Sequence, residues 1–364
     1  MNKPLHGVRV VEMGSVVLAP YAAQILADLG ADVIKVEPPK GDITRNQGFS
    51  RHAGMAALYL SCNRGKRSLV LDAKQPEGLA ALRRLLSGTD VFLHNLRAAT
   101  AERLGIGHAS VSASNPGLIY CATYGYGAAG RHSDRPAYDH VVQAMTGMAM
   151  MGGVEGDDPI KTGFPVVDAA TGMLGALAIV SALHQRNRDG RSILLDVSMA
   201  AASMQLMYSY AVEALTKGVS PRRVGNQGYS GSPAADFFRT RDGWIALGAN
   251  TPAQFARLLE VLELGELAAD PALFDGAAEP GEQVSFLRAK DPVLLKSRLR
   301  ERIAGWEAAR LEQRLAQAGV PASKVRSVAE FAADAVASGA LEPVVLKDGE
   351  DSATVPGLGF RAWA

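Results

Sequence analysis

The first third of the chain alternates short apolar strands with helical segments, and this alternation constrains the fold more than any other feature. Helical patterns at residues 21–29 and 76–86 separate successive predicted strands, and Gly30 and Pro38-Pro39 interrupt the chain between them. The predicted strands are residues 8–13, 32–37, 68–71, 90–94 and 118–122. Strand, crossover helix and strand in repetition predict an α/β fold with a doubly wound, mostly parallel, Rossmann-like sheet.

The remaining sequence predicts a return to the sheet and then a second domain. Helices are expected at residues 138–151, 169–185 and 199–217, with a strand at 192–197 between the last two. A glycine-rich stretch without periodicity follows, and Arg241-Asp-Gly243 then indicates a hairpin. Helical patterns fill 252–319, and the tail looks strand-like. We therefore predict a large domain of residues 1–215 and 325–364, a linker at 216–224, and a smaller α+β domain at 225–320.

A doubly wound sheet predicts a ligand at the carboxyl ends of its strands. The segment after the first predicted strand, GSVVLAP (residues 14–20), lacks the glycine triplet that brings backbone against a pyrophosphate. This argues against a dinucleotide cofactor.

Charge and composition exclude several other classes. The formal net charge is +1, without a long basic run, so a nucleic-acid partner is not expected. Cys62 and Cys121 are the two cysteines, too few for a disulfide framework or a cysteine metal site. The apolar segment 166–183 contains Asp168 and many small residues, which makes it a poor membrane span. We expect a soluble cytoplasmic protein with neither a metal nor a membrane partner.

Asp168 is the one charged residue in GFPVVDAATGMLGALAIVSAL (residues 163–183). Because Val166 and Val167 favour extended backbone and the residues after Asp168 have helical spacing, Asp168 is expected at a helix N-cap. The alternative is a functional carboxylate, ionised by the helix dipole and surrounded by small residues that leave room for a substrate. The local pattern leaves both interpretations open.

Several stretches, in order along nearly the whole chain, resemble the class III CoA-transferases, which include formyl-CoA and carnitine CoA-transferases and the methylacyl-CoA racemases. The segments that carry the resemblance are GVRVVEMGSVVLAPYAAQILADLGADVIKVEPPKGDITR, NRGKRSLVLDAKQPEG, LIYCATYGYG, RPAYDHVVQAMTGM, GFPVVDAATGM, RRVGN and FFRTRDGWIALGAN. The resemblance implies acyl-CoA and a carboxylic acid as substrates, no permanently bound cofactor, and a homodimer of two interlinked chains.

The resemblance places the family's catalytic aspartate at Asp168, in VVDAATGM. In the family this carboxylate attacks the thioester of an acyl-CoA and forms aspartyl intermediates. Covalent catalysis of this kind divides one difficult acyl exchange into easier steps.

The resemblance also implies residues that contact CoA, most of them directly after predicted strands. They are Val16, Leu71, Lys74, Asn95, Leu96, Arg97, Arg103, Leu104 and Tyr124. Two positions depart from some relatives: Pro38 stands in place of an arginine, and Tyr124 in place of a lysine. Lys40, Arg45 and Arg67 are candidates to replace the missing charge.

Two alternatives stay open at this point. Racemases similar to this chain carry a histidine and a glutamate as proton-transfer residues, whereas this chain has Tyr138 and Thr251 at those positions. Tyrosine, with an ordinary pKa of about 10, is a weak base at neutral pH. Transferase is therefore favoured over racemase or epimerase, and a CoA-binding protein without turnover is the third possibility. Val17, where the formyl-CoA branch has glutamine, argues against oxalate or formate as the substrate.

Overall fold

The computed structural model describes residues 3–50, 54–274, 286–348 and 351–360. Its contacts group the chain into two units. Unit 1 contains residues 1–152, 158–222 and 339–364, and unit 2 contains residues 153–157 and 223–338. This grouping places residues 325–338 in unit 2, whereas the sequence-based bounds assign them to the large domain. The domain bounds themselves stay a prediction, and their last residues, 361–364, lie outside the described part.

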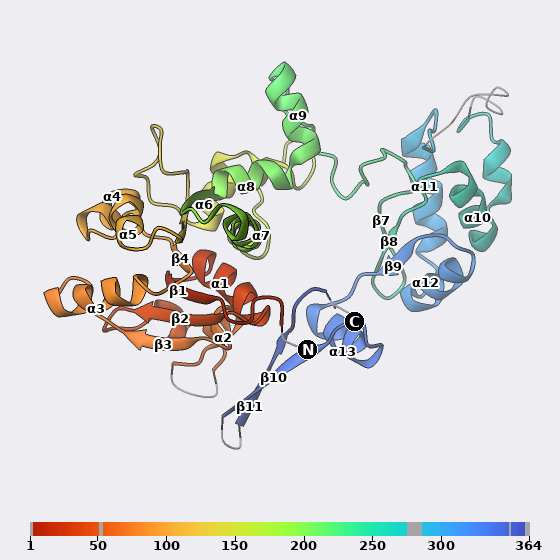
Figure 1. Ribbon diagram of the computed structural model, residues 1–364. Coiled ribbons are helices and arrows are strands. Elements are labelled where there is room, and N and C mark those ends of the chain that lie inside the picture. The colour runs from red at the N-terminus through yellow and green to blue at the C-terminus, as the bar shows by residue number, and fades with distance from the viewer. Residues whose placement is uncertain (1–2, 51–53, 275–285, 349–350, 361–364) are drawn as a thin grey trace. The chain divides into compact units, whose positions relative to one another are not determined.

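Unit 1 is built on a six-stranded sheet in the order β3-β2-β1-β4-β5-β6, with every neighbouring pair parallel (Figure 1). The strands are β1 (Arg9–Met13), β2 (Asp32–Glu37), β3 (Arg67–Val70), β4 (Val91–His94), β5 (Ile119–Tyr124) and β6 (Ile193–Ser198). The predicted parallel α/β sheet is confirmed. The strand order reverses direction between β1 and β4, and such a reversal is where open α/β sheets bind ligands.

Helices cover both faces of this sheet. On one face, α1 (Leu18–Asp28) and α7 (Val166–Asp189) pack on apolar side chains of β1, β2, β4 and β5. On the other face lie α3 (Pro76–Leu86), α4 (Ala98–Arg103) and α5 (His108–Ser114). Both faces are therefore buried, as a doubly wound sheet requires.

α7 is long and apolar enough to cross a membrane, judged by length and composition alone. Within unit 1, Ala176, Ile179 and Leu183 of α7 pack in one apolar cluster with Ala22 and Leu26 of α1. Gly172 allows the two helices to approach closely: a Cβ there would lie 3.1 Å from the Leu18 carbonyl oxygen and 2.9 Å from Tyr21.

Two of the helices predicted after β5 are shorter or divided in the structure. The helix expected at 138–151 is α6 (Asp139–Met145) followed by the short η2 (Met148–Met150). The one expected at 199–217 is divided at Met207 into α8 (Met199–Leu206) and α9 (Tyr208–Lys217). The remaining elements of unit 1 are η1 (Ile43–Asn46), α2 (Ala57–Asn63), and the antiparallel hairpin of β10 (Pro343–Asp348) and β11 (Asp351–Pro356).

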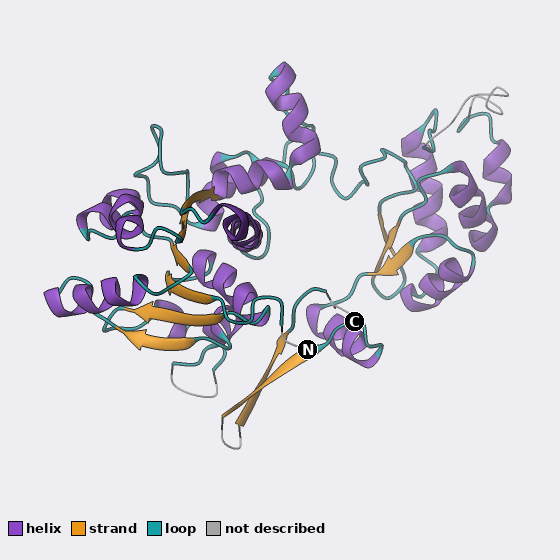
Figure 2. Cartoon of the chain, viewed as in Figure 1, coloured by secondary structure: helices purple, strands orange, loops and turns teal. Residues whose placement is uncertain are grey.

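Unit 2 combines helices with a three-stranded antiparallel sheet, in the order β7-β8-β9 (Figure 2). Its strands are β7 (Phe237–Arg239), β8 (Trp244–Leu247) and β9 (Ala322–Lys324), and its helices are α10 (Pro252–Leu262), η3 (Gly265–Ala269), α11 (Pro292–Ile303), α12 (Ala308–Gln317) and α13 (Val328–Ala337). The expected strand-like tail is thus wrong over α13, which begins with a capping box of Ser327 and Glu330.

Both cysteines are free and buried in unit 1, Cys62 in α2 and Cys121 in β5. Burial raises the pKa of each thiol, that of Cys121 to about 12.

Candidate active site

The carboxyl edge of the six-stranded sheet carries most of the residues expected to contact CoA. Val16 follows β1, Leu71 and Lys74 follow β3, Asn95, Leu96 and Arg97 follow β4, and Tyr124 ends β5. Because the strands are parallel, these strand ends meet at one edge. Arg103 and Leu104 lie one step further along, at the end of α4.

The segment between β1 and α1 has a strained turn at this edge. Val16 has φ +68°, in the left-handed region that a β-branched residue rarely adopts. Beside it, Ser15 and Asn95 form a reciprocal pair: the Ser15 N–H donates to Asn95 Oδ1 at 3.1 Å, and Asn95 Nδ2 donates to the Ser15 carbonyl at 2.9 Å. This pair joins the loops after β1 and β4, at the point where the strand order reverses.

Four of the predicted CoA contacts are brought together in one apolar cluster. Leu71, Leu96, Leu104 and Tyr124 are partly buried against the core below α3, α4 and α5. A half-buried apolar surface at a strand edge suits the flat and aliphatic parts of a CoA molecule.

The cationic side chains considered as partners for CoA fall into two groups, those without an ion pair and those with one. The side chains of Lys74, Arg97 and Arg103 are exposed, and within the described residues none of them has an ion pair. In contrast, Arg45 is paired with Glu37 at 2.6 Å, and Arg67 with Asp32 at the opposite, amino-terminal edge of the sheet. Neither arginine is free to replace the charge absent at Pro38 and Tyr124, whereas Lys40 is exposed beyond β2.

A buried histidine orders the loop after β4. His94 Nδ1 accepts the Leu96 N–H at 3.2 Å, which assigns the proton to Nε2, and Nε2 lies 2.7 Å from the Tyr120 hydroxyl. That hydroxyl donates to the Ile106 carbonyl at 3.1 Å. Burial lowers the pKa of His94 to about 3, so the ring is neutral and structural.

Asp168 lies in the first turn of α7 and is not its N-cap, which corrects the expectation from sequence. α7 begins at Val166, the cap position is Pro165, and no side chain of residue 165 can cap it. Instead, the carboxylate of Asp139 in α6 accepts two N–H groups, from Val167 at 2.8 Å and from Asp168 at 2.9 Å. The helix start is thus capped from another helix, and the Asp168 carboxylate is free for other contacts.

A polar network extends this cap to the loop before α7. Gln143 is fully buried; its amide donates to Asp139 and to Thr162 Oγ1, and its carbonyl accepts the Thr162 N–H at 2.9 Å. The Thr162 hydroxyl donates to the Phe164 carbonyl at 2.8 Å. Every polar group in this chain of contacts has a partner, so the backbone that carries Asp168 is firmly held.

The environment of Asp168 favours its protonated form, which is opposite to the effect expected from the helix dipole. Burial, and secondly the negative charge of Asp139, raise the pKa of Asp168 to about 7. A carboxylate whose pKa is near neutrality, in the first turn of a helix, is typical of a reactive group. The cluster of Leu18 with Val167 connects this position to the Val16 turn.

The two positions expected to distinguish racemases have different surroundings here. Thr251 caps α10 in a capping box with Gln254. Tyr138 precedes α6 and is largely exposed, and its ring stacks on His140 with the ring centroids 6.3 Å apart. Neither residue is the histidine or glutamate that the resemblance implies for a racemase.

Sequence reasoning missed Asp139, Glu12 and Lys35, although each gives a signal. Glu12 and Lys35 each stand between two apolar residues inside a predicted strand, where a charge is rarely buried unless paired. Asp139 stands directly at a predicted helix start, one turn before another polar residue, Gln143.

Known proteins resemble this chain over nearly its whole length. A model of CoA-transferase family III matches residues 5–362. The succinate–glutarate CoA-transferase of Agrobacterium fabrum is 34% identical over 98% of this chain and 88% of its own length. The succinyl-CoA–D-citramalate CoA-transferase of Chloroflexus aurantiacus is 33% identical over 91% and 81%.

Solved structures show the same fold. A CAIB/BAIF family protein from Brucella suis aligns with a TM-score of 0.82 and 33% identity, covering 94% of this chain and 89% of that one. A Mycobacterium tuberculosis protein in an orthorhombic crystal form aligns with a TM-score of 0.83 and 29% identity, covering 99% and 93%.

Proposed function

Because this chain belongs to CoA-transferase family III, we propose that it transfers CoA between carboxylic acids through a covalent intermediate on Asp168. The observation that carries the proposal is the placement of Asp168: a carboxylate in the first turn of α7, with its backbone held by Asp139 and its pKa raised to about 7. The reaction class itself follows from the family.

The proposed reaction begins when the ionised Asp168 carboxylate attacks the thioester carbon of an acyl-CoA. The carbon–sulfur bond breaks, leaving an acyl-aspartyl anhydride and the CoA thiolate. The thiolate then attacks the aspartyl carbon, which releases the first acid as its carboxylate and leaves an aspartyl-CoA thioester. Attack by the acceptor carboxylate gives a new anhydride and the thiolate again, and the thiolate finally takes the acceptor acyl group. The sequence regenerates Asp168 with no net proton change.

In this proposal the chain supplies position and charge control. Asp139, Gln143 and Thr162 fix the backbone of Asp168, which keeps the nucleophile in one place through all four attacks. Leu71, Leu96, Leu104 and Tyr124 provide the apolar contact for CoA. The exposed Lys74, Arg97 and Arg103 meet its phosphates.

For the substrates, we infer that the donor is a succinyl-CoA-like thioester of a dicarboxylic acid. Relatives from two bacteria are named for succinate or succinyl-CoA. The acceptor is then a second dicarboxylic or hydroxy-dicarboxylic acid, as in the names of those relatives.

We further propose that the chain forms the interlinked homodimer expected of its family. Large apolar side chains are exposed on α9: Tyr208 at 71%, Val212 at 63% and Leu215 at 80%. An apolar surface of this kind supports burial against a second chain. Light scattering of the purified protein tests this: twice the chain mass is expected, and a monomer overturns it. Since some relatives are named as alpha and beta subunits, a stable monomer would favour pairing with a second, different chain.

The test of the mechanism is a trapped adduct. Incubation with succinyl-CoA and then hydroxylamine or borohydride is expected to modify Asp168, located by mass spectrometry of peptides. In Asp168→Asn, the label and the exchange of CoA between acids should both disappear, with turnover reduced by at least about a thousandfold. A label on another residue, or near-normal turnover in this variant, contradicts the proposed intermediate.

A further inference from the structure

Four charged side chains are buried together below the Val16 turn, on the α1 side of the sheet. Glu12 and Lys35 are fully buried and stand opposite each other in the register of β1 and β2. Asp42 joins them from the loop after β2, and Lys66 from the residue before β3. Two ammonium groups and two carboxylates balance their charges, which buried charge requires.

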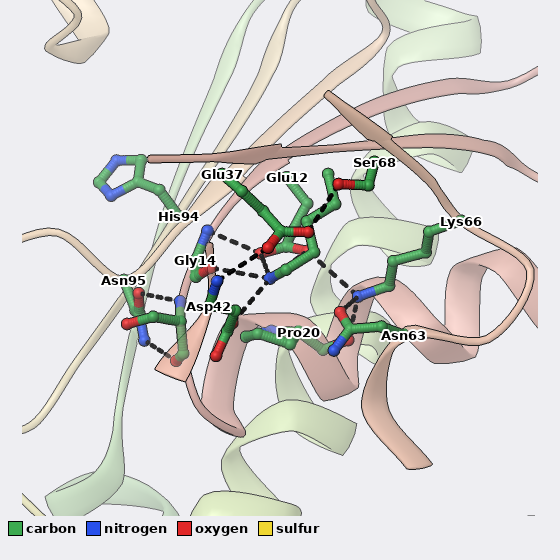
Figure 3. Close-up of polar contacts among 12 residues, drawn as sticks. Glu12, Gly14, Pro20, Glu37, Asp42, Asn63, Lys66, Ser68, His94 and Asn95 are labelled. Atoms are coloured by element: carbon green, nitrogen blue, oxygen red, sulfur yellow. Dashed lines mark hydrogen bonds and ion pairs between the residues drawn. The ribbon is translucent and has the colours of Figure 1, made fainter. Parts of the chain in front are cut away.

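The ammonium of Lys35 lies at the centre of this group. Nζ is 3.3 Å and 3.4 Å from the two Glu12 carboxylate oxygens and 3.1 Å from Asp42 Oδ2. It also donates to the Gly14 carbonyl at 2.9 Å, while the Gly14 N–H donates to Glu12 Oε1 at 2.6 Å. Both backbone polar groups of Gly14 are therefore bound to the Glu12–Lys35 pair (Figure 3 shows the contacts of Glu12 and Gly14).

The first turn of α1, which follows the Val16 turn, is held by the second ammonium. Lys66 Nζ donates to the Pro20 carbonyl at 2.7 Å and to Asn63 Oδ1 at 2.9 Å, and it lies 3.1 Å from Glu12 Oε2 (Figure 3). With Ser15 held by Asn95, the backbone is fixed by side chains on both sides of Val16. Left-handed backbone at a β-branched residue persists only where its surroundings over-determine it, and these contacts do so.

We propose that Lys35 is a positioning residue of the acyl-CoA site: its buried ammonium fixes the Gly14 carbonyl and so keeps Val16 in the left-handed turn that contacts CoA. The proposal rests on the proposed function above, in which Val16 is a CoA contact. Lys35 itself is fully buried and acts only through the turn.

Loss of the ammonium has a specific expected consequence. In Lys35→Met the apolar stem remains, but the Gly14 carbonyl loses its donor and Glu12 loses one of its two cations. Val16 is then free to relax to negative φ, which displaces the turn from the CoA position. The dissociation constant of CoA should rise about tenfold or more.

The experiment measures CoA binding by calorimetry in the Asp168→Asn protein, so that no turnover interferes. The matched control is Asp42→Asn, which also removes one charge from the buried group but leaves both contacts of Gly14 in place. We expect Lys35→Met to weaken CoA binding at least about tenfold and Asp42→Asn less than about threefold. Equal losses in the two variants overturn the proposal, because they indicate a general effect of the charge cluster on folding.

A double-mutant cycle with Val16→Gly adds a readout that a purely structural role would not change. Glycine adopts left-handed backbone without strain, so the turn no longer needs Lys35. The loss caused by Lys35→Met should therefore be several-fold smaller when residue 16 is glycine. Additive losses overturn the proposal. If Lys35→Met does not fold, Lys35→Gln replaces it in the same cycle, with the same criterion.

Failure of this proposal is distinguishable from failure of the proposed function. Substantial turnover by Asp168→Asn would refute the nucleophile, yet it would leave the comparison of CoA affinities intact. An unchanged affinity in Lys35→Met would refute the positioning role, whatever the chemistry of Asp168.

Discussion

The Asp139 carboxylate holds the peptide group of Asp168: Oδ2 of Asp139 accepts the Asp168 N–H at 2.9 Å. The same contact fixes the nucleophile that we propose and places a negative charge beside it. Asp139 therefore has two opposing effects on Asp168, since it orders the backbone but raises the pKa of the neighbouring side chain. These two effects can be separated by substitution.

The first prediction is a dependence of activity on pH near neutrality. Only the ionised Asp168 can attack a thioester, and burial together with Asp139 raises its pKa to about 7. We expect kcat/KM to fall about tenfold for each pH unit below this value and to level off above it. Initial rates between pH 5 and 9 check this. A flat profile down to pH 5 would show that Asp168 is ionised throughout.

The second prediction separates charge from capping at Asp139. Asp139→Asn keeps an oxygen that accepts the two N–H groups of α7 but removes the charge, so the midpoint of the pH profile should move to lower pH. Asp139→Ala should give the same shift and, in addition, lose the cap, at about 1–2 kcal/mol of unfolding free energy. Pairing pH profiles with denaturant titrations distinguishes the two. An unchanged midpoint in both variants would exclude the influence of Asp139.

The third prediction concerns the stability of Asp168→Asn. The folded pKa of Asp168 is about 7, against an ordinary value of 3.8, so the folded state binds more protons between these pH values. Wild-type stability should therefore fall as pH rises through this window, and the cost is complete above pH 7. Asparagine removes that cost, so the variant should be more stable at pH 8 by on the order of 2 kcal/mol.

This stability gain must disappear near pH 4, where both forms of the protein carry an uncharged side chain at residue 168. Urea titrations at pH 4 and pH 8 provide the comparison. A gain of the same size at both pH values would point to packing and not to ionisation.

The fourth prediction uses two glycines of α7 as a matched pair. A Cβ at Gly172 would lie 2.9 Å from Tyr21 and 3.1 Å from the Leu18 carbonyl, whereas a Cβ at Gly175 would meet Ala22 at an ordinary 3.5 Å. Gly172→Ala should therefore cost about 1–3 kcal/mol by forcing α1 and α7 apart. Gly175→Ala should be neutral or stabilise by up to about 1 kcal/mol, through helix propensity. Thermal unfolding of both variants measures the contrast.

The strands of the sheet could be predicted because they are largely apolar and bounded by glycine and proline. β2 and α3 have the predicted residues, 32–37 and 76–86, and the other strands of the sheet differ by a residue or two. Short helices such as α2 and α4 could not be found, because so few residues show no clear period. α13 was missed because its apolar residues, among them Val328 at 88% exposure, do not mark a buried stripe.

At the site, the limits of prediction have a different cause. The sequence identified Asp168, but local propensity placed this residue at the N-cap. Local propensity cannot reveal that the carboxylate of Asp139, 29 residues earlier, already caps the helix. Val166 and Val167 are helical despite their preference for extended backbone, because Asp139 binds the N–H of Val167. Contacts distant in sequence decided both points, and the same holds for the buried Glu12–Lys35 pair.

Because Cys62 and Cys121 are buried, the folded protein should react very slowly with thiol reagents. Since complete CoA transfer consumes one thioester and produces another, free CoA accumulates only when water intercepts an intermediate. A chromogenic disulfide added to a reaction mixture would therefore report the hydrolytic leak directly, against a low background. With substrate omitted, the rate of the same colour change would measure how fast the buried thiols become accessible, which for Cys121 requires the core around β5 to open.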